Sequence, residues 1–300
     1  MKHLRNLVLP IAIIVGLLFH KECHYLKVIV PTLIFTILLL NFVAVDVKKL
    51  KINMMTIWLM LFQVGVSIGT YGLLLALKVN EIVAEGILAG VICPVAASVV
   101  VIACMLGANR ETVTSYTIVD NLMLAFVIPI CFSFISTHQD MPFINSFLLI
   151  LSKVGTTIGL PFVVALLLQY FLPKINGFLT KYSGASFYIW AVALCITLGQ
   201  TIDFIFIHGK GNGSSILALG IASIIFCIIQ FGFGKWIGHK YGDTMAGGQL
   251  LGQKNTAMGI WIANTYLNPL ASVYLALYSI WQNLFNSWQL WQHDKKKAEK

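Results

Sequence analysis

The sequence is short of charged residues. Asp, Glu, Lys and Arg make up 10% of its 300 residues, whereas 58% are hydrophobic, and soluble domains average about 25% charged residues. A chain of this composition cannot cover a water-facing surface of its size, which excludes one or two soluble domains. The 20 basic residues outnumber the 11 acidic ones, but they stand singly between apolar runs, so the excess does not indicate a nucleic-acid partner. These absences indicate an integral membrane protein whose partner is the lipid bilayer.

Paired cysteines and metal-binding motifs are also missing. The six cysteines are spread along the chain with no C-x-x-C pair, which is not the pattern of a disulfide-bonded scaffold. The histidines fall at the ends of apolar segments, with no H-E-x-x-H motif, so we expect no metal site and no cofactor. No Ser/His or Asp/Asp dyad with a known motif around it lies within an apolar segment, which disfavours a membrane enzyme or sensor.

Ten apolar segments are candidates for spanning a bilayer, which takes roughly 20 residues per helix. The runs are continuously apolar rather than alternating, which favours an all-helical fold over a β-barrel. The first segment is short and could be a signal peptide, but no A-x-A-like site follows Phe19, so we expect a retained helix. The expected spans are 6–20, 27–45, 53–77, 84–106, 113–136, 146–173, 183–207, 214–236, 246–265 and 270–291.

The positions of lysine and arginine test this number of spans, because cytoplasmic loops carry an excess of these residues. With ten spans and the N-terminus inside, most basic residues lie on the inner side, including the C-terminal group 295–297. The stretch 243–256 is polar for a membrane helix, but leaving it out of the bilayer would move that group outside. The sequence therefore predicts a single transporter domain over 1–300 in the cell membrane, with both termini cytoplasmic.

Two of the expected spans are interrupted, each being the fourth span in its half of five. Pro94 lies in the middle of one, and glycines with the polar run 253–256 lie in the other. Proline blocks a helical hydrogen bond, and irregular backbone at membrane depth must be buried in protein or line a wet cavity. A five-span unit repeated in tandem inserts upside down the second time, as is common in secondary transporters. We therefore predict an inverted 5+5 repeat with two broken helices that cross, whose helix N-termini suit an anion.

Short motifs at these positions resemble the bile acid:sodium symporter family. The similar stretches are 85–121 with Cys93 and Pro94, the run 252–258, and 279–283 in the last span. The resemblance implies transport of an organic anion such as a bile acid, a steroid sulfate, a pantoate-like acid or pyruvate, usually driven by sodium. It also implies that spans four and nine cross near the substrate, and that the chain divides into a panel domain (about 6–45 and 146–207) and a core domain (about 53–136 and 214–291).

The resemblance assigns roles to individual residues. Asn255 and Thr256 match residues at the start of a half-helix that faces the substrate, and Gln63 and Thr117 match residues near a sodium ion. Other family ligands for sodium fall on side chains without oxygen, namely Val99, Val100, Val113 and Leu250. Because a hard cation needs several oxygen ligands, we expect transport without sodium. The expected substrate-binding set is Pro94, Ala97, Ser98, Asn255 and Thr256, and the expected ion or charge site is Gln63, Thr117, Asp120, Gln253 and Lys254.

A lysine inside a span requires an explanation. Placing one at a helix centre costs roughly 2.5–3.5 kcal/mol, and Asp120 is the one carboxylate well inside the fifth span. We hypothesise that Asp120 pairs with Lys254 and that the pair replaces sodium. Two roles stay open: a permanent structural substitute, or a pair in which one member exchanges a proton during transport.

These residues leave three functions to compare. The first is a secondary transporter of a small organic anion that works by alternating access, independent of sodium and coupled to protons in one version. The second is a cation/proton antiporter of related fold with Asp120 as the cation-binding group, and the third is a conventional sodium:organic-anion symporter. Outside this site, we expect Asp203 and Glu85 to be solvated acids near span ends. We expect Lys153 to reach toward the lipid interface.

Overall fold

The computed structural model describes residues 11, 14–45, 52–96, 98–135 and 142–298. In this part of the chain the regular structure is helical, with one isolated β-bridge. Within the described residues, six helices are long and apolar enough to cross a membrane, which makes the chain a membrane-embedded protein. They are His20–Phe42, Met54–Ala76, Arg110–Ser133, Phe143–Phe171, Ser183–Ile207 and Gly213–Lys240.

The helices of the first half follow the expected spans from 27–45 onward. They are α2 (His20–Tyr25), the 3-10 turn η1 (Leu26–Ile29), α3 (Val30–Phe42), α4 (Met54–Ala76), α5 (Glu81–Ile92), α6 (Val99–Met105) and α7 (Arg110–Ser133). The expected span 6–20 lies partly outside the described residues.

The second half begins with a span that contains a π-helix. The elements of the second half are α8 (Phe143–Val154), the π-helix η3 (Gly155–Gly159), α9 (Leu160–Phe171), α10 (Pro173–Lys181), α11 (Ser186–His208), α12 (Gly213–Lys240), α13 (Thr244–Gly252), α14 (Thr256–Tyr266), the 3-10 turn η5 (Pro269–Ala271) and α15 (Ser272–Ala298). Because six long helices are fewer than ten spans, the inverted 5+5 repeat stays a prediction.

Asparagine and aspartate side chains fix where several helices begin. Asn53 accepts from a backbone N–H in the first turn of α4, Asn80 does so for α5, Asn109 for α7 and Asp243 for α13. Such caps satisfy donors that a helix start leaves unpaired, and each contributes about 1 kcal/mol. The short polar residues between apolar runs therefore set the helix boundaries.

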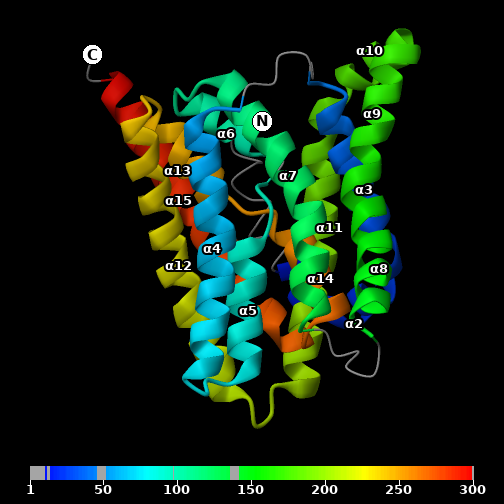
Figure 1. The fold of residues 1–300 in the computed structure, drawn as a ribbon, viewed down its shortest axis with the longest axis vertical. Helices are drawn as coiled ribbons and strands as arrows, with labels where there is room; N and C mark the ends of the chain where they lie inside the picture. Colours follow the sequence, from blue (N-terminus) through cyan, green and yellow to red (C-terminus); the bar gives the residue numbers. More distant parts are fainter. Residues whose placement is uncertain (1–10, 12–13, 46–51, 97, 136–141, 299–300) are drawn as a thin grey trace.

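The helices form two groups with α7 and α14 between them (Figure 1). One group holds α4, α5, α12, α13 and α15, in which α12 packs on both α13 and α15. The other holds α2, α3, α8, α9, α10 and α11, in which α3 packs on α9 and α11. The division into a panel and a core domain stays a prediction.

Glycines bring α12 and α13 into direct backbone contact. A Cβ added at Gly247 of α13 would lie 2.2 Å from the carbonyl oxygen of Gly234, and one at Gly234 would lie 2.3 Å from that of Gly247. Small residues at helix interfaces permit such close approach in membranes, where packing drives association. This contact fixes α13, and with it the interruption that follows α13.

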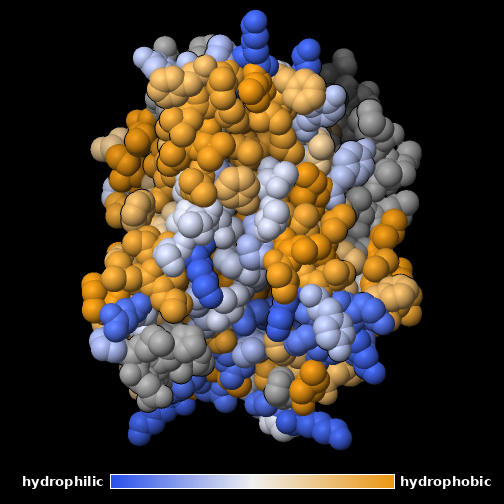
Figure 2. All heavy atoms as spheres, turned by 90° about the vertical axis from the view of Figure 1, so that its right-hand side faces the viewer, coloured by the Kyte–Doolittle hydropathy of each residue, from blue (hydrophilic) through white to orange (hydrophobic). Residues whose placement is uncertain are grey.

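The outward surface suits lipid. Large apolar side chains such as Leu217, Ile221 and Ile228 are exposed along α12, and Figure 2 shows an apolar belt on another face, with hydrophilic residues gathered toward its lower end. Lys153 is exposed on α8, directly before the π-helix. Its exposure fits a side chain that extends along the membrane-facing surface.

Candidate functional site

The two interrupted segments meet inside the helix bundle. The stretch 93–98 separates α5 from α6, and the stretch 253–255 separates α13 from α14. Val95 and Lys254 form the isolated antiparallel bridge between these stretches. Both breaks expected from the sequence are therefore present, and they lie against each other. We call these two stretches the crossover.

Backbone hydrogen bonds on both sides of the bridge hold the crossover together. The Ala96 N–H donates to the Gln253 carbonyl at 2.9 Å, and the Asn255 N–H donates to the Pro94 carbonyl at 2.8 Å. The Cys93 thiol adds a bond to the Asn255 carbonyl at 3.1 Å. Each interruption thus satisfies part of the other's backbone, as irregular backbone inside a membrane protein requires.

Side chains of α4 donate hydrogen bonds to backbone carbonyls at the C-terminal end of α5. The amide nitrogen of Gln63 donates to the Ile92 carbonyl at 3.2 Å and to the Cys93 carbonyl at 3.0 Å. One turn further along α4, the Ser67 hydroxyl donates to the Leu88 carbonyl at 3.1 Å. Gln63, expected near an ion, therefore binds the backbone at which α5 ends.

Side chains of α15 and α7 bind the two bridge residues. The Gln282 side-chain oxygen accepts from the Lys254 N–H at 2.8 Å, and its nitrogen donates to the Lys254 carbonyl at 3.2 Å. On the other strand, Asp120 Oδ2 accepts from the Val95 N–H at 2.8 Å. The crossover is therefore fixed by α4, α7 and α15 together.

Lys254 and Asp120 are both fully buried, with 1% and 0% of their surfaces exposed. They interact electrostatically, but within the described residues no ion pair joins them. Neither Lys254 Nζ nor Asp120 Oδ1 has a hydrogen-bond partner in this part of the chain. Lys254 lies two residues after the end of α13 and two residues before the start of α14, so helix ends of both polarities flank its backbone.

The remaining predicted residues of span nine lie at the crossover. The Ser98 hydroxyl of the partner strand accepts from the Gln253 side chain at 2.9 Å. Asn255 caps α14, its side-chain oxygen accepting from the Met258 N–H at 3.4 Å. The Thr256 hydroxyl is buried, and in the described chain it has no hydrogen-bond partner.

Two predicted residues contribute differently. The Thr117 hydroxyl donates to the Val113 carbonyl within α7 at 2.8 Å, so its proton is used by its own helix. Ala97, expected to line the substrate site, lies outside the described residues. The roles of these and the other predicted site residues stay predictions.

The apolar residues that stand where the resemblance would place oxygen ligands for sodium pack together in one cluster. Val99, Val113 and Leu250 have no exposed surface, and they lie in one hydrophobic cluster that also contains Leu59 and Tyr116. Among the described residues, no group of three or more His, Cys, Asp or Glu side chains could hold a metal ion. Three of the positions where the family resemblance would place sodium ligands are therefore filled by packed hydrocarbon.

Several residues of the site had no assigned role in the sequence. Gln282 lies in a motif that supported the family resemblance, and Tyr278, whose hydroxyl donates to the Gly252 carbonyl at 2.7 Å, lies one turn before it. The Tyr116 hydroxyl donates to the Gln63 side-chain oxygen at 3.2 Å. The sequence signal that could have identified these residues is a polar side chain within an apolar span, because such a side chain needs a hydrogen-bond partner inside the protein.

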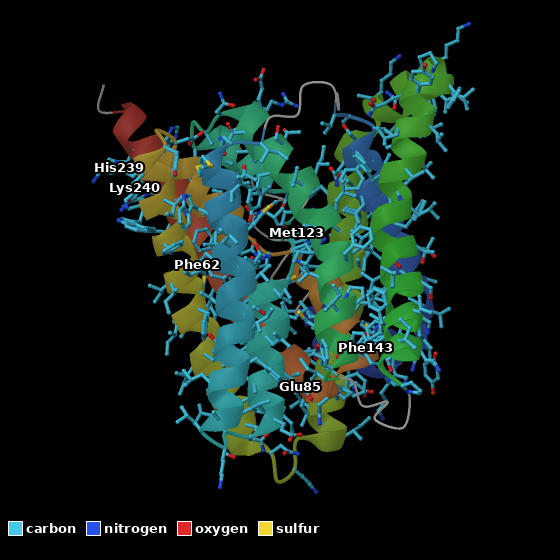
Figure 3. The ribbon with its side chains drawn as sticks, viewed as in Figure 1. Phe62, Glu85, Met123, Phe143, His239 and Lys240 are labelled. Carbon is cyan, nitrogen blue, oxygen red and sulfur yellow. The ribbon has the colours of Figure 1, made fainter. Side chains whose placement is uncertain are left out.

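Two acids expected to be solvated are buried. Glu85, labelled in Figure 3, is 7% exposed and accepts from the Asn268 N–H at 2.9 Å. Asp203 is 6% exposed and binds His20. The expectation is wrong for both, because the turn after α14 presents an N–H to Glu85 and α2 packs over the end of α11 that carries Asp203.

Comparison with models of known protein families and with curated protein sequences finds no match to this chain.

Proposed function

We propose that this chain is a secondary transporter of a small organic anion that works by alternating access around the crossover. The observation that carries the proposal is the meeting of two interrupted helices beside Lys254, whose buried ammonium has no hydrogen-bond partner in the described chain. In transporters, unwound segments of this kind form the binding site near the bilayer midplane. A buried positive charge there favours a carboxylate or a sulfate.

The proposed architecture is the inverted 5+5 repeat with panel and core domains. The directions of the half-helices support it: in Figure 1, α5 rises from the lower end of the bundle, whereas α13 descends from the upper end. The two half-helices α5 and α13 therefore reach the crossover from opposite ends of the bundle. The resemblance to the bile acid:sodium symporter family implies the same arrangement. The distribution of lysine and arginine predicts both termini on the cytoplasmic side of the cell membrane.

Transport independent of sodium is part of the proposal. The packed cluster of Val99, Val113 and Leu250 offers no oxygen ligand, which disfavours a conventional sodium symporter. The fixed charge of Lys254 takes the place of a bound cation in this proposal. Asp120, whose Oδ2 binds the opposite strand of the crossover, would either balance that charge or exchange a proton with each transport cycle.

A cation/proton antiporter is the second candidate. It is favoured by one observation: Asp120 places a fully buried carboxylate beside the crossover, and carboxylate oxygens are cation ligands. Vesicles that change their internal pH on addition of Na⁺ or K⁺, with no organic acid present, would support this candidate.

The test is a thermal-shift screen of the purified protein against organic acids, with and without sodium. Ligand stabilisation grows with ligand concentration relative to Kd, so a transported anion raises the unfolding temperature. We expect stabilisation in potassium buffer, a smaller stabilisation in Lys254→Gln, and full retention in Lys153→Gln, which removes an exposed lysine of another span. Stabilisation that requires sodium, or none by any acid, contradicts the proposal.

A further inference from the structure

A polar cavity lies away from the crossover. It has a volume of about 100 Å³ and lies between the α2–η1 segment, α11 and α14. Asn264 and Trp261, which line it, are on α14. At 1.5 Å per residue, Asn264 lies about 12 Å along the helix axis from Thr256, where α14 leaves the crossover. In the proposed topology the cavity opens on the outer side of the membrane.

Two amide side chains leave polar groups unsatisfied in this cavity. Asn264 donates to the Gln200 side-chain oxygen at 3.4 Å. The Gln200 side chain is 3% exposed, and its nitrogen, like the Asn264 oxygen, has no partner in the described part of the chain. If the oxygen and nitrogen positions of both side-chain amides are exchanged, one N–H₂ donor and one carbonyl acceptor of the pair still have no partner in this part of the chain. Buried polar groups are nearly always paired, so this pair points to a ligand with both an acceptor and a donor.

The charge that lines the cavity is positive. Lys27 and His24 contribute to its wall. Asp203 binds His20 Nδ1 at 2.8 Å, and its other carboxylate oxygen lies 3.3 Å from His24 Nδ1. The ion pairs found among the described residues do not include Lys27. Lys27 places a positive charge at the cavity wall, and none of the residues that line the cavity is acidic, which favours an anion.

Size and wall chemistry narrow the ligand further. Since a water molecule occupies about 30 Å³ in the liquid, the cavity holds a ligand, or the end of a ligand, of only a few non-hydrogen atoms. The aromatic rings of Trp261 and Phe204 form the apolar part of its wall. A carboxylate would meet Lys27 and the amide N–H₂, and a hydroxyl beside it would donate to the free amide carbonyl.

We propose that this cavity is an outer binding subsite for a carboxylate with a neighbouring hydroxyl, as in a short 2-hydroxy acid or the end of a larger one. The subsite deepens the proposed transport function, on which its role as a capture site before the crossover rests. Its capacity to bind an anion rests on Lys27, Gln200 and Asn264 alone.

The experiment compares lactate with propionate, which lacks the hydroxyl, by calorimetric titration of the purified full-length protein. We expect lactate to bind at least tenfold more tightly than propionate. Lys27→Gln should weaken lactate binding about tenfold, and Asn264→Leu should remove the preference for lactate. Lys21→Gln is the matched control, because Lys21 is an exposed lysine of the same segment that does not line the cavity.

The crossover variant Lys254→Gln separates this subsite from the transport site. We expect it to lose uptake into proteoliposomes while it retains lactate binding that depends on Lys27. Binding that depends on Lys27 without any uptake by the wild type would support the subsite and contradict the transport function. Lactate binding that is absent, equal to that of propionate, unchanged in Lys27→Gln or abolished in Lys254→Gln would overturn the subsite.

Discussion

Gln282 binds both backbone groups of Lys254, accepting from its N–H at 2.8 Å and donating to its carbonyl at 3.2 Å. One side chain of α15 thus holds the lysine's backbone at the bridge, and the ammonium takes no part in these two bonds. The residues are 28 positions apart in the sequence, so this bond also joins the last helix to the crossover. The geometry separates two contributions: Gln282 holds the strand, and Lys254 supplies the charge.

Replacing Gln282 with leucine is therefore expected to destabilise the protein. The change leaves the Lys254 N–H and carbonyl without this partner in a buried site, and each unsatisfied group costs about 1–3 kcal/mol. We expect a clear fall in the unfolding temperature, measured by differential scanning fluorimetry in detergent. Gln292→Leu, a half-buried position further along α15, is the control and should change little. Equal stability of the two variants would show that the two-point bond does not hold the crossover.

Replacing Lys254 with methionine should also destabilise the protein. Lys254 interacts electrostatically with the buried Asp120, and removing one member of a pair of buried charges leaves the other uncompensated, at a cost of about 3–5 kcal/mol. We expect Lys254→Met to lower the unfolding temperature and to abolish uptake of the anion into proteoliposomes. Lys153→Met, which removes an exposed lysine, should leave stability and uptake intact. A Lys254→Met protein that still transports would argue against a functional charge at this position, and unchanged stability would argue against the electrostatic pairing with Asp120.

Asp120 tests whether transport is coupled to protons. Asn at this position keeps an oxygen that accepts from the Val95 N–H, the bond that Asp120 makes at 2.8 Å, but it cannot exchange a proton. If the pair is a proton carrier, Asp120→Asn should still bind the anion, while its uptake no longer responds to an imposed pH gradient. Uptake measured with and without the gradient decides the matter. A gradient response equal to that of the wild type would leave the carboxylate with a structural role.

The sequence located the crossover because its signals are local. Pro94 and the glycine-rich polar run around Lys254 break helices through their own backbone chemistry, so their positions could be predicted from residues nearby in the chain. The partners of the crossover could not be predicted in this way, because which face of α15 turns toward Lys254 depends on how whole helices pack. Asp203 shows the same limit: its partner His20 is 183 residues away, and nearness to a span end wrongly indicated exposure.

The contact between α12 and α13 offers a matched pair of glycine substitutions. Gly247→Ala would place a Cβ 2.2 Å from the Gly234 carbonyl oxygen, whereas Gly232→Ala on α12 would meet nothing within 4 Å. Overpacking costs about 1–3 kcal/mol, while alanine in an open helical position gains up to about 1 kcal/mol over glycine. We therefore expect Gly247→Ala to lower the unfolding temperature and Gly232→Ala to leave it unchanged or raise it. Because α13 leads directly into the crossover, Gly247→Ala should also reduce anion-dependent stabilisation, and equal behaviour of the two variants in both assays would mean that this backbone contact does not position the site.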